Sequence, residues 1–243
     1  GTPRTNISDN LIENSMPFQG MAKSSDLTGI GIYIAGDANN AIIERNQVLN
    51  SGYNGIHFGG NYTLVKNNLV DNYCLWKQDG GGIYTNSDGL TNMNNVGREV
   101  VGNIVTRGIG AQEGSSINYK LAEGIYIDDN AQGLKIFQNT ISDTNGKGIY
   151  LHNGNNIQIL ENTIYKSPDQ LHVTHDYTGN PVRNVTIERN QFSSIYENEV
   201  AFSISSILAD INQIGVSDNN YYLDPFQKNL IFKSKGSNEG PIG

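Results

Sequence analysis

The segment 123–153, EGIYIDDNAQGLKIFQNTISDTNGKGIYLHN, contains one pattern twice, as GIYIDDN from Gly124 and as GIYLHN from Gly148. A spacer that includes FQNTIS separates the two copies. The pattern recurs along most of the chain, and self-similarity of this kind is the signature of a repeat architecture. The repeat therefore decides the fold.

An asparagine element recurs eight times and alternates with the Gly-Ile-Tyr element. The asparagine elements are DNLI, RNQV, NNLV, GNIV, QNTI, ENTI, RNQF and DNNY, aligned at Asn10, Asn46, Asn67, Asn103, Asn139, Asn162, Asn190 and Asn219. The second element starts at Gly31, Gly55, Gly82, Gly124 and Gly148, with QLH at Gln170. The runs between them, such as LKIF and IQIL, alternate as strands with one buried face do.

Short strands at this spacing are also found in sandwiches and barrels. Only a solenoid needs the same residue at the same phase of each turn, because every coil stacks on a similar neighbour. The repeats resemble those of right-handed parallel β-helix proteins, the pectate-lyase-like superfamily, over about residues 5–222. The resemblance implies an all-β, right-handed parallel β-helix solenoid of about eight coils, and it does not define the reaction.

Residues 1–225 are expected to form the β-helix domain, and residues 226–243 a C-terminal strand and tail. No capping element precedes the first asparagine element, so the chain is expected to be part of a larger protein. A formal charge of -8 argues against nucleic acid or an anionic membrane as partner. The single cysteine, Cys74, excludes an internal disulfide framework. A secreted, periplasmic or cell-surface location is expected.

Alternation of side chains along a strand predicts which residues of each GIY element face outward. If Ile125 and Ile127 face the core, Tyr126 and Asp128 face outward. The same phase predicts an outward column, called the ring ladder here, of Tyr33, His57, Tyr84, Tyr126, Tyr150 and His172. Aromatic rings stack on sugars, so Tyr84, Tyr126, Tyr150 and His172 are predicted to bind a polysaccharide or oligosaccharide. Rings that only stack on one another are the alternative.

Carboxylates and imidazoles follow the ring ladder. Asp128 or Asp129 is expected one coil from His152, with His175 one coil further, an arrangement suited to acid–base catalysis. Both aspartates can face one groove only if the strand ends or bulges there. A neighbouring column is expected to cap turns and to stay outside the site; it contains Asp37, Asn61, Asp88, Asn130, Asn153 and Asp176.

A second polar cluster precedes the strands. It supplies Trp76 and Lys77 as further substrate-binding candidates and Asp79 and Glu123 as second-choice acids. Three insertions, at 14–29, 87–99 and 107–122, are also functional candidates. No metal site is assigned; calcium is the cofactor considered, although no calcium-binding repeat is present. No Ser-His-Asp arrangement or thiol nucleophile is evident.

Three functions remain open. A glycoside hydrolase would use the carboxylates and the ring ladder. A polysaccharide lyase or uronate epimerase would use His or Tyr as a base, and its groove is expected to be basic, whereas this chain has 16 Lys and Arg against 24 acids. A non-catalytic carbohydrate-binding or adhesive β-helix would need the ring ladder alone. The paired Asp128 and Asp129 is the only motif of pectin-cleaving hydrolases present, so the hydrolase is preferred without transfer of their catalytic roles.

Overall fold

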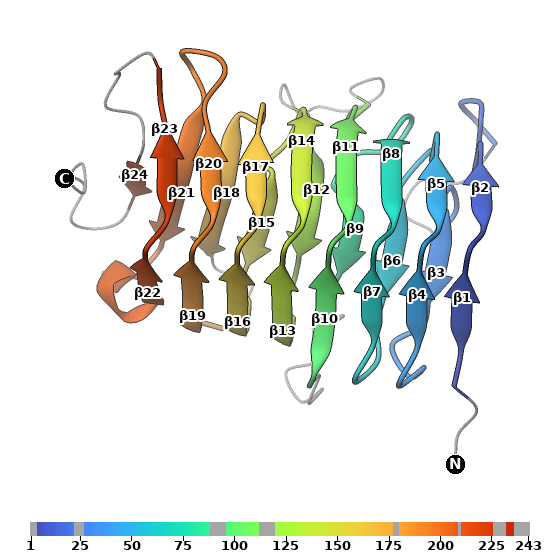
Figure 1. Ribbon diagram of the computed structural model, residues 1–243, viewed down its shortest axis with the longest axis horizontal. Coiled ribbons are helices and arrows are strands. Elements are labelled where there is room, and N and C mark those ends of the chain that lie inside the picture. The colour runs from blue at the N-terminus through green and yellow to red at the C-terminus, as the bar shows by residue number, and fades with distance from the viewer. Residues whose placement is uncertain are drawn as a thin grey trace.

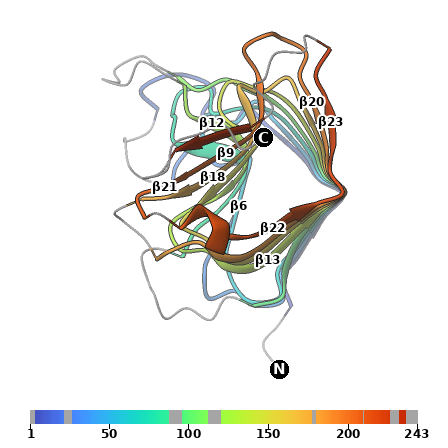
Figure 2. The same cartoon turned by 90° about the vertical axis from the view of Figure 1, so that its left-hand side faces the viewer.

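The computed structural model describes residues 4–21, 27–87, 96–111, 120–176, 180–208, 210–225 and 232–235. The chain winds through three strands per coil, and each strand pairs with its counterparts in the neighbouring coils, as β12 does in parallel register with β9 and β15. The eight coils lie side by side along one axis, from β1 to β22 (Figure 1). Seen along that axis, three sheets surround one core (Figure 2).

Sheet A contains β1 (Asn6–Ser8), β4 (Ile42–Glu44), β7 (Leu64–Lys66), β10 (Arg98–Val101), β13 (Gln132–Phe137), β16 (Asn155–Leu160), β19 (Arg183–Glu188) and β22 (Gly215–Asp218). Sheet B contains β2 (Leu11–Glu13), β5 (Gln47–Leu49), β8 (Leu69–Tyr73), β11 (Ile104–Gly108), β14 (Thr140–Thr144), β17 (Thr163–Tyr165), β20 (Gln191–Ser193) and β23 (Tyr221–Leu223). Sheet C contains β3 (Ile32–Ile34), β6 (Ile56–Phe58), β9 (Gly80–Thr85), β12 (Ala122–Ile127), β15 (Ile149–His152), β18 (Asp169–His175), β21 (Val200–Ser206) and β24 (Phe232–Lys235). Within the described ranges the one helical element is the 3-10 helix η1 (Ile211–Gln213).

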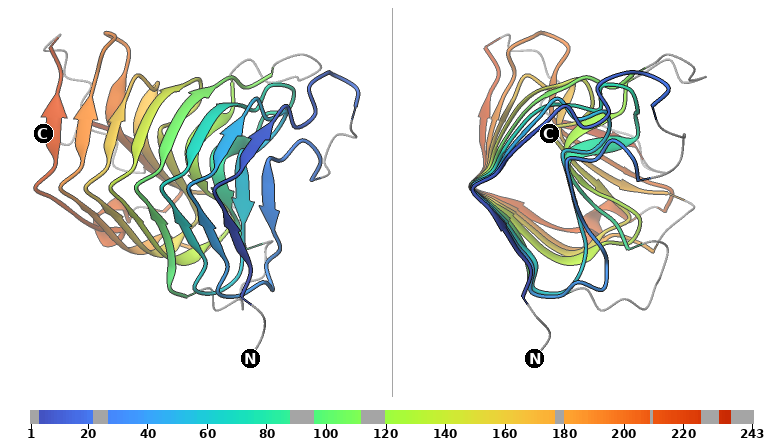
Figure 3. Two further views of the ribbon diagram at one scale, coloured as in Figure 1. Left: turned by 45° about the vertical axis from the view of Figure 1, so that its right-hand side comes forward. Right: turned by 90° about the vertical axis from the view of Figure 1, so that its right-hand side faces the viewer.

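The corner between sheets A and B is held by a column of asparagines that are buried except at the two ends of the column. Each amide oxygen accepts hydrogen bonds from the preceding asparagine, and each amide nitrogen donates to the next asparagine and to a backbone carbonyl. Asn103 Nδ2, for example, donates to Asn139 Oδ1 at 3.0 Å and to Val65 O at 3.0 Å. The corner is the sharp edge visible in both end-on views (Figures 2 and 3). The column runs through Asn10, Asn46, Asn68, Asn103, Asn139, Asn162, Asn190 and Asn220.

The alignment of two repeats at Asn67 and Asn219 was therefore wrong by one residue. These two residues occupy the preceding position, where the backbone is left-handed with φ of 53° at both. Gly102 has φ of 65° at the equivalent position. Asparagine tolerates this conformation better than most residues, so the Asn-Asn pairs satisfy the turn and the column at once.

The predicted facing of the GIY strands is confirmed. Ile125 is 1% exposed and Ile127 is fully buried in the core. The same core positions of sheet C are occupied by Ile32, Ile56, Ile83, Ile149 and Leu171, all in the hydrophobic cluster. Sheet C therefore presents Tyr84, Tyr126 and their equivalents on its outer side, where the candidate site lies.

Candidate functional site

The ring ladder has the predicted register on the outer side of sheet C. Tyr84, Tyr126, Tyr150 and His172 pair in sequence across neighbouring strands, and His57 pairs with Tyr84. The rings contact one another, with centroids 5.3 Å apart for Tyr84–Tyr126 and 4.9 Å for Tyr126–Tyr150. The column is thus a continuous wall of rings.

The sequence predicts that the rings of the ring ladder are exposed, and this is wrong at the centre of the ladder. Tyr84 is 8% exposed and Tyr126 5%, whereas Tyr33 at the N-terminal end is 46% exposed. The central rings are covered because each meets its neighbours edge-on or face-on and because their hydroxyls are directed at carboxylates: Tyr84 at Asp128 and Tyr126 at Asp79. Other rings of the ladder, such as Tyr150, stay partly exposed.

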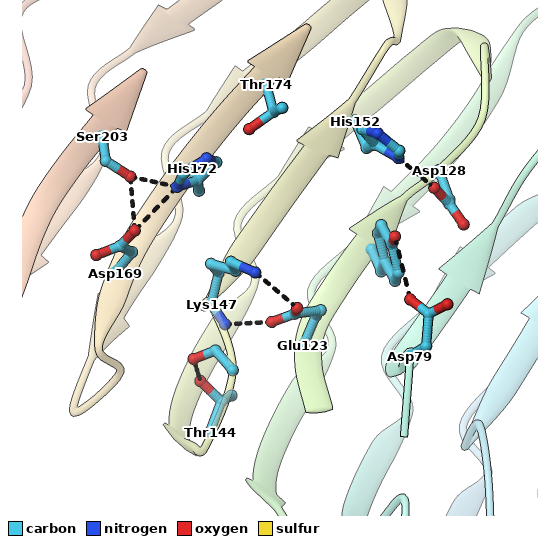
Figure 4. A network of polar contacts seen from close by, with 12 residues as sticks. Asp79, Glu123, Asp128, Thr144, Lys147, His152, Asp169, His172, Thr174 and Ser203 are labelled. Atoms are coloured by element: carbon cyan, nitrogen blue, oxygen red, sulfur yellow. Dashed lines mark hydrogen bonds and ion pairs between the residues drawn. The ribbon is translucent and has the colours of Figure 1, made fainter. Parts of the chain in front are cut away.

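His152 lies between two carboxylates at the end of β15. Its Nδ1 is 2.7 Å from Asp128 Oδ1 and its Nε2 is 2.8 Å from Asp176 Oδ2. Because a carboxylate only accepts hydrogen bonds, both ring nitrogens donate and the ring is an imidazolium. Burial alone lowers the pKa of His152, but the hydrogen bonds to Asp128 and Asp176 outweigh burial and raise it to about 9. Figure 4 shows His152 directed at Asp128.

Asp128 and Asp129 face the same side because the strand ends just before them. β12 stops at Ile127, and the backbone turns left-handed at Asp129 with φ of 35°. Asp129 N donates to Asp128 Oδ1 at 2.9 Å, and Asp129 Oδ1 lies 3.8 Å from His152 Nδ1. The side chain of Asp129 is 45% exposed. Burial and the charge of Asp128 raise the pKa of Asp129.

Asp79 reaches the ring ladder from the loop before β9. Its Oδ1 accepts a hydrogen bond from the Tyr126 hydroxyl at 3.5 Å (Figure 4). One side of Asp79 stays open to solvent, while protein atoms on its other side and the charge of Asp128 raise the pKa of its carboxyl. Asp79 is therefore electrostatically coupled to the paired aspartates.

Glu123 is 1% exposed beneath the ring ladder. Its carboxylate accepts a hydrogen bond from the backbone N–H of Lys147. It accepts a second one from Lys147 Nζ, which lies 3.2 Å from Glu123 Oε1. Burial raises the pKa of Glu123 to about 7, against the opposing effect of Lys147. The Lys147 ammonium also lies 4.3 Å from the centroid of the Tyr150 ring. Glu123 is therefore buried and paired with Lys147.

The remaining candidates lie apart from this cluster. His175 is 5% exposed and faces inward, with Nδ1 3.4 Å from Ser206 Oγ. Lys77 donates to Thr28 O at 3.1 Å and lies over the Tyr53 ring, in the same loop as Trp76. The centres of the three insertions, including Asp88, fall outside the described residues.

Asp176 is the site residue that the sequence did not indicate. One carboxylate oxygen of Asp176 accepts from Asn153 Nδ2 at 2.9 Å, while Asp176 N donates to Asn153 Oδ1 at 3.0 Å. Its second oxygen accepts from His152, which the capping interpretation left out. The sequence signal that could have identified Asp176 is its position directly after the strand that ends at His175, one coil beyond His152.

Asp128, Asp129 and His152 place potential metal ligands within 4.8 Å of one another. Calcium takes six to eight oxygen ligands. Here Asp128 already accepts hydrogen bonds from Tyr84, His152 and Asp129, and both His152 nitrogens face carboxylates. The arrangement is a hydrogen-bonded ion cluster, and it does not fit a calcium site without displacement of these bonds.

These features define a parallel β-helix solenoid with an aromatic and acidic network on the outside of one sheet. The chain belongs to the family described as right handed beta helix region, whose model matches residues 1–192 and 113–235. Comparisons with curated proteins and with solved structures find no match. No helix within the described ranges is long and apolar enough to cross a membrane.

Proposed function

We propose that this chain is a polysaccharide-degrading enzyme, a glycoside hydrolase that uses paired carboxyl groups outside sheet C. The observation that carries the proposal is the coupling of Asp79 and Asp129. The pKa of each is raised by burial and by the charge of Asp128, and each keeps a side open to solvent. Glycoside hydrolysis needs two such carboxyl groups, one of which carries a proton.

Asp79 is assigned as the general acid and Asp129 as the general base. Asp128 is held by hydrogen bonds from Tyr84 and His152, so it positions the cluster and does not move. Inverting enzymes hold their two carboxyl groups about 6.5–9.5 Å apart, and retaining enzymes about 5–5.5 Å. The Tyr126 hydroxyl contacts Asp79 and the Tyr84 hydroxyl contacts Asp128, and we propose that these separate contacts hold the two carboxyl groups at the wider spacing of an inverting enzyme.

The protonation states favour a hydrolase over a lyase or epimerase. Burial raises the pKa of Tyr84, of Tyr126 and of Tyr150, which makes a phenolate base costly to form. His152 carries a proton between its two carboxylates and lacks the lone pair that a base needs. Around Asp128, carboxyl groups therefore remain as the acid–base pair.

The proposal is tested by incubating the protein with a panel of neutral and uronate polysaccharides. We expect new reducing ends without unsaturated uronate ends. Unsaturated ends would identify a lyase, and binding without any product would identify a binding module. On a substrate that is cleaved, Asp79→Asn and Asp129→Asn should each lose at least about a hundredfold in kcat. The matched control is Asp143→Asn, an aspartate of sheet B that pairs with Lys166.

A further inference from the structure

Another polar cluster lies one and two coils beyond His152, where β18 and β21 lie side by side. Asp169, His172 and Thr174 come from β18, and Ser203 and Ser205 come from β21. His172 pairs with Ser203 and Thr174 with Ser205 across the two strands. All but Asp169 extend columns of the candidate site: Ser203 continues the ring ladder, and Ser205 the column of His152. Figure 4 shows Asp169, His172 and Ser203 converging.

The contacts of His172 determine which ring nitrogen carries the proton. Nδ1 lies 2.9 Å from Asp169 Oδ2 and 2.5 Å from Ser203 Oγ. The Ser203 hydroxyl donates its own proton to Asp169 Oδ2 at 2.7 Å, so both neighbours of Nδ1 accept. Nδ1 therefore carries the proton, and in the tautomer that these contacts select Nε2 presents a lone pair. The hydrogen bonds from His172 and Ser203 outweigh burial and lower the pKa of Asp169.

The lone pair of His172 is directed at a second serine. Nε2 lies 3.5 Å from Ser205 Oγ, and Thr174 Oγ1 lies 3.0 Å from the same oxygen. A distance of this length is typical of a nucleophile and base before the substrate binds. Ser205 is half-buried and the side chain of His172 is 19% exposed, so both can be reached from solvent. Ser203 is 3% exposed and contacts the His172 ring at Nδ1, on the other edge from Ser205.

We propose that Ser205, His172 and Asp169 form a serine esterase site that removes acyl groups esterified to sugar hydroxyls. An aspartate on Nδ1 and a serine on Nε2 is the order of contacts that activates a serine for acyl transfer. The ester chemistry follows from these contacts alone. The sugar part of the substrate rests on the proposed function, because the cluster lies on the same outer side of sheet C as the carboxyl groups of the proposed hydrolase.

In the first step Ser205 Oγ forms a bond to the ester carbonyl carbon while His172 Nε2 takes the hydroxyl proton. The bond from that carbon to the sugar oxygen then breaks, and His172 returns the proton to the leaving oxygen. Water repeats the sequence on the acyl-serine, which releases the carboxylic acid and restores Ser205. The Thr174 hydroxyl is a neighbouring donor for the oxyanion. Water is the sole co-reactant.

The nucleophile is tested on the unaltered protein with diisopropyl fluorophosphate, a reagent that phosphorylates activated serines, and the labelled peptide is located by mass spectrometry. We expect one label, on Ser205. Label on Ser203, or none after prolonged incubation, overturns the proposal. This measurement needs no variant, so it is independent of any effect of substitution on folding.

Turnover is tested with p-nitrophenyl acetate, followed by release of p-nitrophenolate. Ser205→Ala and His172→Gln should lose about a hundredfold or more in kcat, and Ser217→Ala, an exposed strand serine of sheet A, should not. Asp169→Asn, a positioning change, should lower kcat with KM unchanged and shift the pH profile. Equal rates for Ser205→Ala and wild type would refute the assignment. Because this substrate contains no sugar, failure of the proposed hydrolase would leave the result intact.

Discussion

The charge of His152 makes the stability of this protein depend on pH in a defined window. Hydrogen bonds to Asp128 and Asp176 raise the pKa of His152 from 6.5 to about 9. A group whose pKa is raised on folding binds its proton more tightly in the folded state, so it stabilises that state at low pH. This contribution is fully present below about pH 6.5 and is lost as the pH rises through about 9. The shift corresponds to about 3 kcal/mol.

The measurement compares wild type with His152→Gln by urea denaturation at pH 6 and at pH 9.5, followed by circular dichroism. Other groups also titrate, among them Glu123 with a pKa of about 7, so the difference between the two proteins is the quantity of interest. We expect the stability gap to shrink by about 3 kcal/mol between the two pH values. Asp176→Asn, which removes one of the two carboxylates, should show a smaller change. A gap that is the same at both pH values would refute the imidazolium between Asp128 and Asp176.

Three further predictions concern the scaffold. Asn139→Ala leaves buried backbone groups of neighbouring coils unpaired, so it should lower the free energy of unfolding in urea by about 2–6 kcal/mol. The control Gln158→Ala changes an exposed residue and should lower it by less than about 0.5 kcal/mol. Equal losses for the two variants would contradict the asparagine column. Gly146→Ala places a methyl group against the Glu123 carboxylate and should disrupt the hydrogen bonds between Glu123 and Lys147. The expected loss in stability is about 1.5–3 kcal/mol, measured as a lower melting temperature. An unchanged melting temperature would show that this carboxylate can move. Ile125→Asp buries an unpaired charge and should cost about 4 kcal/mol or more; a variant that melts like wild type would place Ile125 on the outer side.

The repeated positions of the fold follow from sequence because each coil stacks on a similar neighbour. A residue such as Ile125 recurs at the same phase in successive coils, so its buried facing and the register of Tyr126 with Tyr84 and Tyr150 could be predicted. The asparagine column could be predicted as well, except where two asparagines are adjacent. At Asn67 the backbone conformation selects which of the pair turns inward, and the sequence pattern does not contain that information.

Contacts made by side chains across turns and between columns required the tertiary structure. Alternation along a strand states that Tyr84 faces outward, but its burial depends on neighbouring rings and on the Asp128 carboxylate that meets its hydroxyl. Asp176 and His152 meet because one follows a strand end and the other closes a strand one coil earlier. Ser205 and His172 lie on a diagonal between two columns, a relation that a column-by-column comparison of the repeats does not reveal. A periodic sequence thus specifies which residues stack, whereas turn geometry and side-chain direction decide which of them share a proton.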